Sequence, residues 1–213
     1  MPGTAIVIGA TGLIGQLLVQ QLLDDGHYSE VRTITRKPLP LQHPKLKQTI
    51  TSLENSVELE AALQGDALFC CIGTTIKKAG SQAAFTAVDH DIPVQCGHIA
   101  RKNGVAQYHL VSAIGAKQGA RNFYLRTKGA TEAALAEMGF PSLYIYRPSL
   151  LLGDRKEVRF GEQAGQWLMP VFSFLLQGGM KKYRPVKAAT VAETMLNKSK
   201  EKEGGVHTVY FNV

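Results

Sequence analysis

The sequence predicts an α/β fold, with a single domain built on a doubly wound, mostly parallel sheet that carries helices on both faces. Three observations lead to this prediction. Apolar runs of strand length alternate with stretches of helical period, several of these runs contain consecutive apolar residues, and the first of them leads directly into a glycine-rich turn. No internal repeat or low-complexity linker interrupts the alternation. We therefore expect one domain over residues 1–213.

Seven segments have the length and composition of strands that are buried on both faces. We expect strands at Thr4–Ile8, Val31–Thr35, Gln48–Ile50, Ala67–Ile72, Gln107–Ser112, Ser142–Arg147 and Thr208–Asn212. Because strands that alternate with helices pair in parallel, these segments are predicted to form one sheet.

Helical periodicity fills the gaps between the strands. Leu13–Asp25 and Arg121–Met138 repeat apolar residues at helical spacing, and a glycine that can end a helix follows each of them. Proline is tolerated in the first turn of a helix, so Pro93 is expected at the start of a third helix. Its neighbours Asp89 and Asp91 are interpreted as capping carboxylates.

The composition restricts which binding partners and which cellular location we expect for the protein. The 24 Lys and Arg against 17 Asp and Glu give a net charge of +7, but the basic residues lack the aromatic interleaving of a nucleic-acid reader. No apolar stretch is long enough to span a membrane, and residues 1–11 do not resemble a signal peptide. We expect a cytoplasmic protein without nucleic-acid, membrane or metal partners, whose three cysteines are buried thiols. Monomer and homodimer both stay open.

The most informative segment is the glycine turn, where Gly9, Gly12 and Gly15 follow a strand and open a helix. Gly9 lets the chain turn sharply out of the strand, Gly12 lets backbone N–H groups approach a pyrophosphate, and Gly15 lets the helix pack closely on the strand. The helix N-terminus would then face the phosphates. This arrangement predicts dinucleotide binding by a Rossmann-type sheet, with a purely structural turn as the alternative.

Two cations follow the second strand, where an acidic residue would bind the ribose 2′-hydroxyl of NAD. Arg36 and Lys37 stand there instead, and they suit the 2′-phosphate of NADP. The prediction is therefore an NADP(H) site, with the alternative that both side chains only solvate a loop.

Catalytic groups are predicted on the helix that follows the fifth strand. Tyr124 and Lys128 are four residues apart and share a helix face, and Ser112 stands at a strand end. A nearby ammonium favours the phenolate and brings Tyr124 toward the range of a general acid, while Ser112 would hold the substrate carbonyl oxygen. A second pair with this spacing, Tyr183 and Lys187, has a proline between its members. The alternative is an amphipathic helix with a packed Tyr124 and a solvated Lys128.

These residues together resemble the extended and atypical short-chain dehydrogenases/reductases, and more narrowly their Tat-interactive-protein-like branch. The resemblance covers nearly the whole chain, and it rests on the glycine turn, Val88-Asp89, Leu110–Ser112 with Gly115-Ala116, Asn122–Tyr124, Lys128-Gly129, Arg147-Pro148 with Gly153–Arg155, and Tyr183–Pro185.

The resemblance implies a set of site residues beyond those that spacing indicates. It implies a pyrophosphate site that includes Gly9, Thr11, Gly12, Leu13, Ile14 and Gly15, and a 2′-phosphate site at Arg36 and Lys37. It also implies adenosine and ribose contacts at Cys71, Ile72, Gly73 and Thr74, catalysis by Ser112, Tyr124 and Lys128, and nicotinamide contacts at Pro148, Ser149 and Leu150.

Two departures from the family pattern affect the expected site. The third strand ends in Thr51-Ser52-Leu53, where many relatives have an Asp that accepts from adenine, so a hydroxyl or the backbone must replace it. Only 58 residues follow Arg155, which predicts a short substrate cap at 155–205 and a small or open pocket. The apolar residues 167–176 within this cap are interpreted as a packed helix rather than a ligand site.

We therefore expect an NADP(H)-dependent oxidoreductase that transfers hydride between nicotinamide and a carbonyl or alcohol substrate, with Tyr124 as general acid or base. The alternative is an NADPH-binding sensor that presents a surface to a protein partner without turnover. The combination of Ser112, Tyr124 and Lys128 favours the enzyme, because a sensor has no chemical need of it. The substrate and the direction of reaction are left open.

Overall fold

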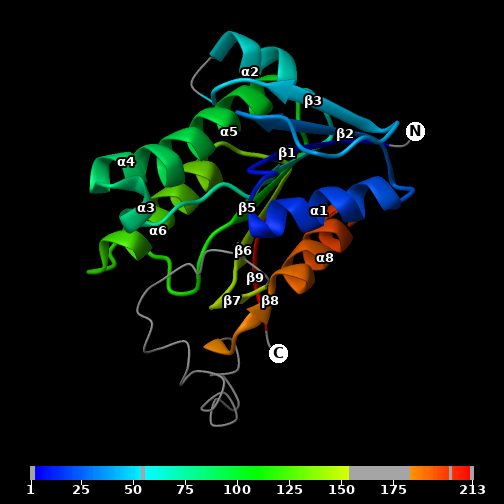
Figure 1. Ribbon diagram of the computed structural model, residues 1–213. Coiled ribbons are helices and arrows are strands. Elements are labelled where there is room, and N and C mark those ends of the chain that lie inside the picture. The colour runs from blue at the N-terminus through cyan, green and yellow to red at the C-terminus, as the bar shows by residue number, and fades with distance from the viewer. Residues whose placement is uncertain (1–2, 54–55, 154–182, 202, 212–213) are drawn as a thin grey trace.

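The fold is built on one parallel sheet, as the computed structural model shows for residues 3–53, 56–153, 183–201 and 203–211 (Figure 1). The main sheet has seven strands in the order β3-β2-β1-β4-β5-β6-β9, and every neighbouring pair is parallel. The strands are β1 (Gly3–Ile8), β2 (Tyr28–Thr35), β3 (Leu46–Ile50), β4 (Ala67–Cys70), β5 (Gln107–Val111), β6 (Ser142–Arg147) and β9 (Gly205–Tyr210). A small parallel pair, β7 (Leu151–Leu152) and β8 (Val186–Lys187), lies outside this sheet.

Helices cover both faces of the sheet (Figure 1). They are α1 (Leu13–Asp24), α2 (Ser56–Ala62), α3 (Ile76–Ala79), α4 (Gln82–Thr86), the π-helical turn η1 (Ala87–Asp91), α5 (Ile92–Lys102), α6 (Phe123–Glu137) and α8 (Ala188–Ser199). Helices α1 and α8 lie side by side on one face, and α2, α5 and α6 cover the other. None of the helices in the described part of the chain combines the length and apolarity needed to cross a membrane.

The two faces of the sheet carry separate apolar cores. Ala5 and Val7 of β1 point into the core beneath α1 and α8, whereas Ile6 and Ile8 point into the core beneath α5 and α6. Because successive side chains of a strand point to opposite faces, both cores need apolar residues. This double burial explains the continuous apolar runs and confirms the predicted doubly wound Rossmann-type fold.

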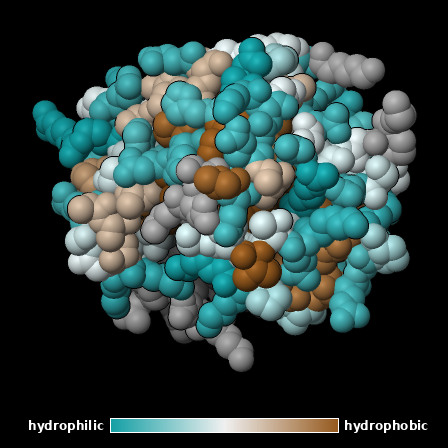
Figure 2. Space-filling model, turned by 90° about the horizontal axis from the view of Figure 1, so that it is seen from above, coloured by the Kyte–Doolittle hydropathy of each residue, from teal (hydrophilic) through white to brown (hydrophobic). Residues whose placement is uncertain are grey.

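The surface carries its exposed apolar side chains in scattered positions. Figure 2 shows one face that is mostly hydrophilic, with apolar residues in small separate groups. Within the described ranges, the large exposed apolar residues come from several different parts of the chain, namely Ile50, Val57, Ile76, Leu152, Tyr183, Val206 and Tyr210. Isolated residues of this kind are usual on the surface of a folded protein.

The last strand lies earlier in the sequence than predicted. The expected range Thr208–Asn212 is replaced by β9 at Gly205–Tyr210, which pairs with β6 over its full length. Strand β9 is at the edge of the sheet, and from Val206 on its residues alternate between exposed and half-buried. The prediction relied on a continuous apolar run, and an edge strand does not have one.

The helix around Pro93 also differs from the prediction. The chain is helical from Gln82 through Lys102, and η1 is a turn of π-helix in which the N–H of Ile92 bonds to the carbonyl of Ala87. Asp89 and Asp91 lie inside this run, so their interpretation as capping carboxylates is wrong. A proline has no N–H and crowds the carbonyl four residues before it, and one wide turn relieves this conflict.

Candidate functional site

The glycine turn between β1 and α1 is as tight as its sequence predicts. Gly9 has a φ of 79°, and a Cβ placed on it would lie 2.5 Å from the carbonyl carbon of Cys71. A Cβ on Gly15 would lie 2.2 Å from the carbonyl oxygen of Gly9. Helix α1 begins after Gly12, and no side chain caps its N-terminus. The turn therefore presents backbone N–H groups that an anion can bind.

The strand end beside this turn belongs to β4. The N–H of Cys71 donates to the carbonyl of Ile8 at 2.9 Å, so the two strands end together. Strand β1 has β2 on one side and β4 on the other, and the order of strands reverses at this point. Ligands of doubly wound sheets bind at such a reversal, outside the carboxyl ends of the strands.

The predicted 2′-phosphate residues lie at the same edge of the sheet. Arg36 and Lys37 are exposed directly after β2, and the hydroxyl of Thr35 donates to the carbonyl of Lys37 at 2.8 Å. The hydroxyl of Thr51, a candidate replacement for the missing adenine-binding Asp, donates to the carbonyl of Ser52 at 3.0 Å. Its proton is therefore used locally, and the hydroxyl keeps only acceptor capacity.

Helix α6 carries the predicted catalytic pair on one face. Asn122 caps the helix by accepting from the N–H of Leu125 at 3.1 Å. The half-buried ring of Tyr124 packs against Phe85 of α4, with the two ring centroids 5.5 Å apart. The second pair with the same spacing is not on one helix, because Lys187 belongs to strand β8. The structure thus supports the choice of this helix over the later segment.

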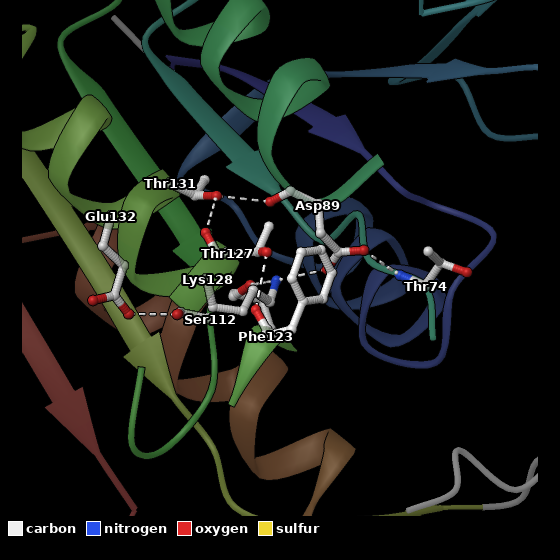
Figure 3. Close-up of polar contacts among 9 residues, drawn as sticks. Thr74, Asp89, Ser112, Phe123, Thr127, Lys128, Thr131 and Glu132 are labelled. Carbon is white, nitrogen blue, oxygen red and sulfur yellow. Dashed lines mark hydrogen bonds and ion pairs between the residues drawn. The ribbon is translucent and has the colours of Figure 1, made fainter. Parts of the chain in front are cut away.

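Lys128 is buried rather than solvated, so the alternative interpretation of its side chain is wrong. Its ammonium donates to the carbonyl of Val111 at 3.1 Å. It also forms an ion pair with Asp89, at 3.1 Å (Figure 3). Burial lowers the pKa of Lys128, but the attraction of Asp89 and of the Tyr124 phenolate outweighs burial and raises it above the ordinary value. Lys128 is therefore a fixed positive charge at the end of β5.

Asp89 is a residue of this site to which sequence reasoning gave only a capping role. One of its carboxylate oxygens pairs with Lys128, and the other accepts from the N–H of Thr74 at 2.8 Å (Figure 3). Its backbone carbonyl accepts from the hydroxyl of Thr131 at 2.8 Å. Asp89 is almost completely buried and connects the segment after β4 with α6. The sequence did contain one indication of an irregular turn at Asp89: Pro93, four residues later, has no N–H to donate to the Asp89 carbonyl.

Ser112 is held by a charged group that the prediction did not include. Its hydroxyl donates to the buried carboxylate of Glu132, which lies one turn beyond Lys128 on α6 (Figure 3). Arg147 donates to both oxygens of Glu132, at 3.0 and 2.5 Å, and to the hydroxyl of Tyr210 at 2.8 Å. Its hydrogen bonds to Glu132 raise the pKa of Arg147. The single proton of Ser112 thus points to Glu132.

The segment expected beside the nicotinamide follows β6. The carbonyl of Pro148 accepts from the N–H of Ile114, and the carbonyl of Leu150 accepts from the N–H of Val186, both at 2.9 Å. The hydroxyl of Ser149 donates to the carbonyl of Arg184. These bonds tie the segment to the loop after Ser112 and to β8.

The same segment then returns to the glycine turn. A Cβ on Gly153 would lie 3.0 Å from side-chain carbons of Leu13, at the start of α1. Asp154, Arg155 and the apolar residues 167–176 lie outside the described residues, as does most of the expected cap at 155–205. The structure thus brings the glycine turn, the segment after β4, α6 and the segment after β6 to one edge of the sheet.

Comparison with known sequences points to one family. The model of an NAD(P)H-binding family matches residues 9–169. The chain is 33% identical to protein HTATIP2 of Rattus norvegicus, over 91% of this chain and 80% of that protein. It is 31% identical to the mitochondrial protein FMP52 of Debaryomyces hansenii, over 72% of this chain and 69% of that protein. The cytoplasmic location expected for this chain stays a prediction.

Comparison with solved structures supports the fold. MoeE5 in complex with UDP-glucose and NAD superposes with a TM-score of 0.75 at 16% identity, covering 99% of this chain and 76% of MoeE5. A UDP-glucose 4-epimerase from Thermotoga maritima, with UDP-glucose, gives a TM-score of 0.74 at 16% identity, covering 99% of this chain and 77% of that one. At such identities the likeness concerns the fold and not the reaction.

Proposed function

The chain belongs to the NAD(P)H-binding family, within the atypical short-chain dehydrogenases/reductases that include HTATIP2 and FMP52, and from this premise we propose that it is an NADP(H)-dependent oxidoreductase acting on a carbonyl or alcohol substrate. The observation that carries the proposal is the placement of Tyr124 and Lys128. They share one face of α6, and the ammonium of Lys128 is held against the end of β5, at the edge where doubly wound sheets bind ligands.

The residues at this edge fit a dinucleotide. The glycine turn leaves no room for a Cβ at Gly9 or Gly15, and the N-terminus of α1 has no side-chain cap that would compete with a phosphate. Arg36 and Lys37 are exposed cations beside the turn, which suits the additional phosphate of NADP. The chemistry that the cofactor supplies when bound is the donation or acceptance of a hydride.

The protein's own groups would manage the proton at the substrate oxygen. Tyr124 would donate its phenolic proton to the oxygen of a carbonyl, or accept the proton of an alcohol in the opposite direction. Lys128 would contact the nicotinamide ribose with its ammonium, which is held at the end of β5 on the same helix face as Tyr124. Ser112 would orient the substrate oxygen: with its own proton on Glu132 it can accept from an alcohol hydroxyl, and to donate to a carbonyl oxygen it must turn its proton away from Glu132.

The substrate class follows from this proton chemistry and is a small molecule with a carbonyl or hydroxyl group. MoeE5 and the Thermotoga epimerase are solved with a UDP-sugar, which supports a small-molecule partner without identifying it for this chain. A small molecule is therefore the partner that we propose for this chain, together with the reaction.

Steady-state screening tests the proposal. Purified protein is mixed with NADPH and a panel of aldehydes, ketones and quinones, and oxidation of NADPH is followed by absorbance. We expect turnover with at least one member of the panel, and we expect the Tyr124→Phe variant to lose it. If NADPH binds without any turnover and instead changes the affinity for a protein partner, the sensor function replaces the enzyme.

A further inference from the structure

The segments along the candidate site are free of acidic residues. Residues 71–88, 112–131 and 148–153 follow β4, β5 and β6, and residues 183–187 include β8, which pairs with β7. Because the sheet is parallel, the segments that follow its strands lie along one edge (Figure 1). None of the four contains Asp or Glu, although the chain as a whole has 24 Lys and Arg against 17 acids. Their charged residues are Lys77, Lys78, Lys117, Arg121, Arg126, Lys128, Arg184 and Lys187.

Few acids offset this positive charge among the described residues nearby. The acids that come next in the sequence are Asp89 and Glu132, which are buried in ion pairs, and Asp91, which contacts a histidine. Six of the eight cations are exposed, whereas Arg184 is half-buried and Lys128 is buried. Like charges gathered on one surface raise the local potential and attract ligands of the opposite sign. This edge of the sheet is therefore suited to an anion.

The loop before α6 brings one of the exposed cations beside Tyr124. The N–H of Lys117 donates to the carbonyl of Leu125 at 3.2 Å, and a Cβ on Gly129 would lie 2.2 Å from the carbonyl carbon of Lys117. Leu125 and Gly129 each directly follow a member of the predicted catalytic pair, so the Lys117 backbone runs along the neighbouring side of the same helix turns. The exposed side chain of Lys117 therefore begins next to the turn that carries Tyr124.

Arg126 holds this loop in place. Its guanidinium donates to the carbonyls of Ala120 and Arg121, at 3.1 and 3.2 Å, and lies over the ring of Phe123, 5.6 Å from the centroid. The N–H of Ala120 donates to the carbonyl of Lys117 at 3.0 Å. The backbone from Lys117 to Arg121 is thus fixed by hydrogen bonds while both of these side chains stay exposed. A rigid loop of this kind can present two cations in a constant position.

Helices α3 and α4 bring two more cations to the start of α6. The buried ring of Phe85 on α4 packs against Phe123 and Tyr124, with centroids 5.8 and 5.5 Å apart. Helix α3 directly precedes α4 and packs on it. Lys77 and Lys78 are exposed in its last turn. Exposed cations therefore come from both of the segments that pack around the first turns of α6.

We infer that the substrate of the proposed oxidoreductase carries a negatively charged group, a carboxylate or a phosphate, and that Lys117 and Arg121 bind this group. Both kinds of anion accept charge-assisted hydrogen bonds from an ammonium and from a guanidinium. The proposal above already gives the cofactor phosphates partners after β1 and β2, whereas these two cations follow β5. The inference rests on the proposed function, because it takes Tyr124 to mark the place of the reacting carbonyl.

A matched pair of probes isolates the effect of charge. 4-Carboxybenzaldehyde and its methyl ester share the ring and the aldehyde and differ by one negative charge. With NADPH, we expect the acid to be reduced with a kcat/KM about tenfold or more above that of the ester at low salt. The difference should shrink as salt is added, because salt screens exposed charges. Glyceraldehyde 3-phosphate and glyceraldehyde make the same comparison for a phosphate.

Two variants test the residues. Lys117→Gln and Arg121→Gln each remove an exposed cation and keep a polar side chain. We expect each to lower kcat/KM for the preferred anionic probe about tenfold, mainly through KM, and to change kcat/KM for its neutral partner and NADPH affinity by less than twofold. The control Lys47→Gln removes an exposed cation of β3 and should leave all three values within twofold of the wild type.

Binding without turnover separates this inference from the proposed function. NADP⁺ cannot reduce an aldehyde, so saturation-transfer NMR in its presence reports the binding of the four probes alone. A protein that binds an anionic probe about tenfold more tightly than its neutral partner, yet reduces neither with NADPH, would support the anion site and refute the oxidoreductase.

Three results would overturn the inference. Equal kcat/KM for each anionic probe and its neutral partner would exclude a charge preference and leave the oxidoreductase intact. A loss of NADPH affinity in Lys117→Gln and Arg121→Gln as large as their loss of kcat/KM would assign these cations to the cofactor. Binding of none of the four probes would also refute the site, and if a poly-glutamate peptide bound instead, the surface would be a docking site for an acidic protein.

Discussion

A buried histidine makes the stability of this fold depend on pH in a predictable way. His109 of β5 is fully buried, and its ring stacks between Phe69 and Tyr144 at centroid distances of 4.6 and 4.9 Å. Its two nitrogens contact the Tyr146 hydroxyl at 2.9 Å and the Gln107 side-chain oxygen at 3.1 Å. A neutral ring satisfies both contacts, donating to Gln107 and accepting from Tyr146. Burial lowers the pKa of His109 to about 3.

The sign and size of the effect follow from linkage between protonation and folding. The unfolded chain protonates His109 near pH 6.5, whereas the folded protein does so only near pH 3, so the unfolded state binds more protons between these values. The stabilising contribution is complete above pH 6.5 and is lost as the pH falls toward 3. At pH 5 the loss amounts to about 2 kcal/mol.

The variant His109→Phe tests this account, because it keeps an aromatic ring in the stack and cannot titrate. Urea unfolding is measured at pH 7 and pH 5 for the wild type, for His109→Phe and for His98→Gln, which removes an exposed histidine. Loss of the Tyr146 and Gln107 contacts lowers the stability of His109→Phe at both pH values. The decrease between pH 7 and 5 should nevertheless be about 2 kcal/mol smaller than in the other two proteins. Equal decreases in all three would refute the reasoning.

Three further predictions concern the site itself. Arg36→Ala should remove most of the preference for NADPH over NADH, because a charge-assisted hydrogen bond contributes about 1.5–3 kcal/mol, and calorimetric titration that finds equal affinities in the wild type would refute the NADP assignment. Gly12→Val should abolish NADPH binding while circular dichroism still shows a folded sheet, and normal binding by the folded variant would make the turn structural. Glu132→Gln should lower the free energy of unfolding by about 2–4 kcal/mol, since it leaves the Arg147 charge without its partner, and a loss below 0.5 kcal/mol in urea unfolding would contradict this pairing.

The features that the sequence predicts well are those with a local cause. Gly9 and Gly15 mark the turn because a strand precedes and a helix follows them within a few residues, and the structure leaves no room for a Cβ at either. Tyr124 and Lys128 are four residues apart, so helical geometry alone places them on one face. The doubly wound sheet follows from apolar runs whose alternate residues fill two cores.

The features that the sequence does not predict depend on contacts between distant segments. Asp89 looks like a capping residue until the π-turn and the partner Lys128, 39 residues away, are known. The hydroxyl of Ser112 is expected at the substrate, and only the folded chain shows that Glu132, held by Arg147, takes its proton. In both cases a buried carboxylate meets a partner that no periodicity or spacing rule connects to it.

The most direct test of the central claim is the effect of Tyr124→Phe on binding and turnover. The substitution keeps the ring that packs against Phe85 and removes the proton that a developing alkoxide requires. With a carbonyl substrate found by screening, the account predicts NADPH affinity within about twofold of the wild type and a loss of turnover of roughly 10²-fold or more. A variant that reduces the same substrate as fast as the wild type would contradict the account and leave Tyr124 as a packing residue.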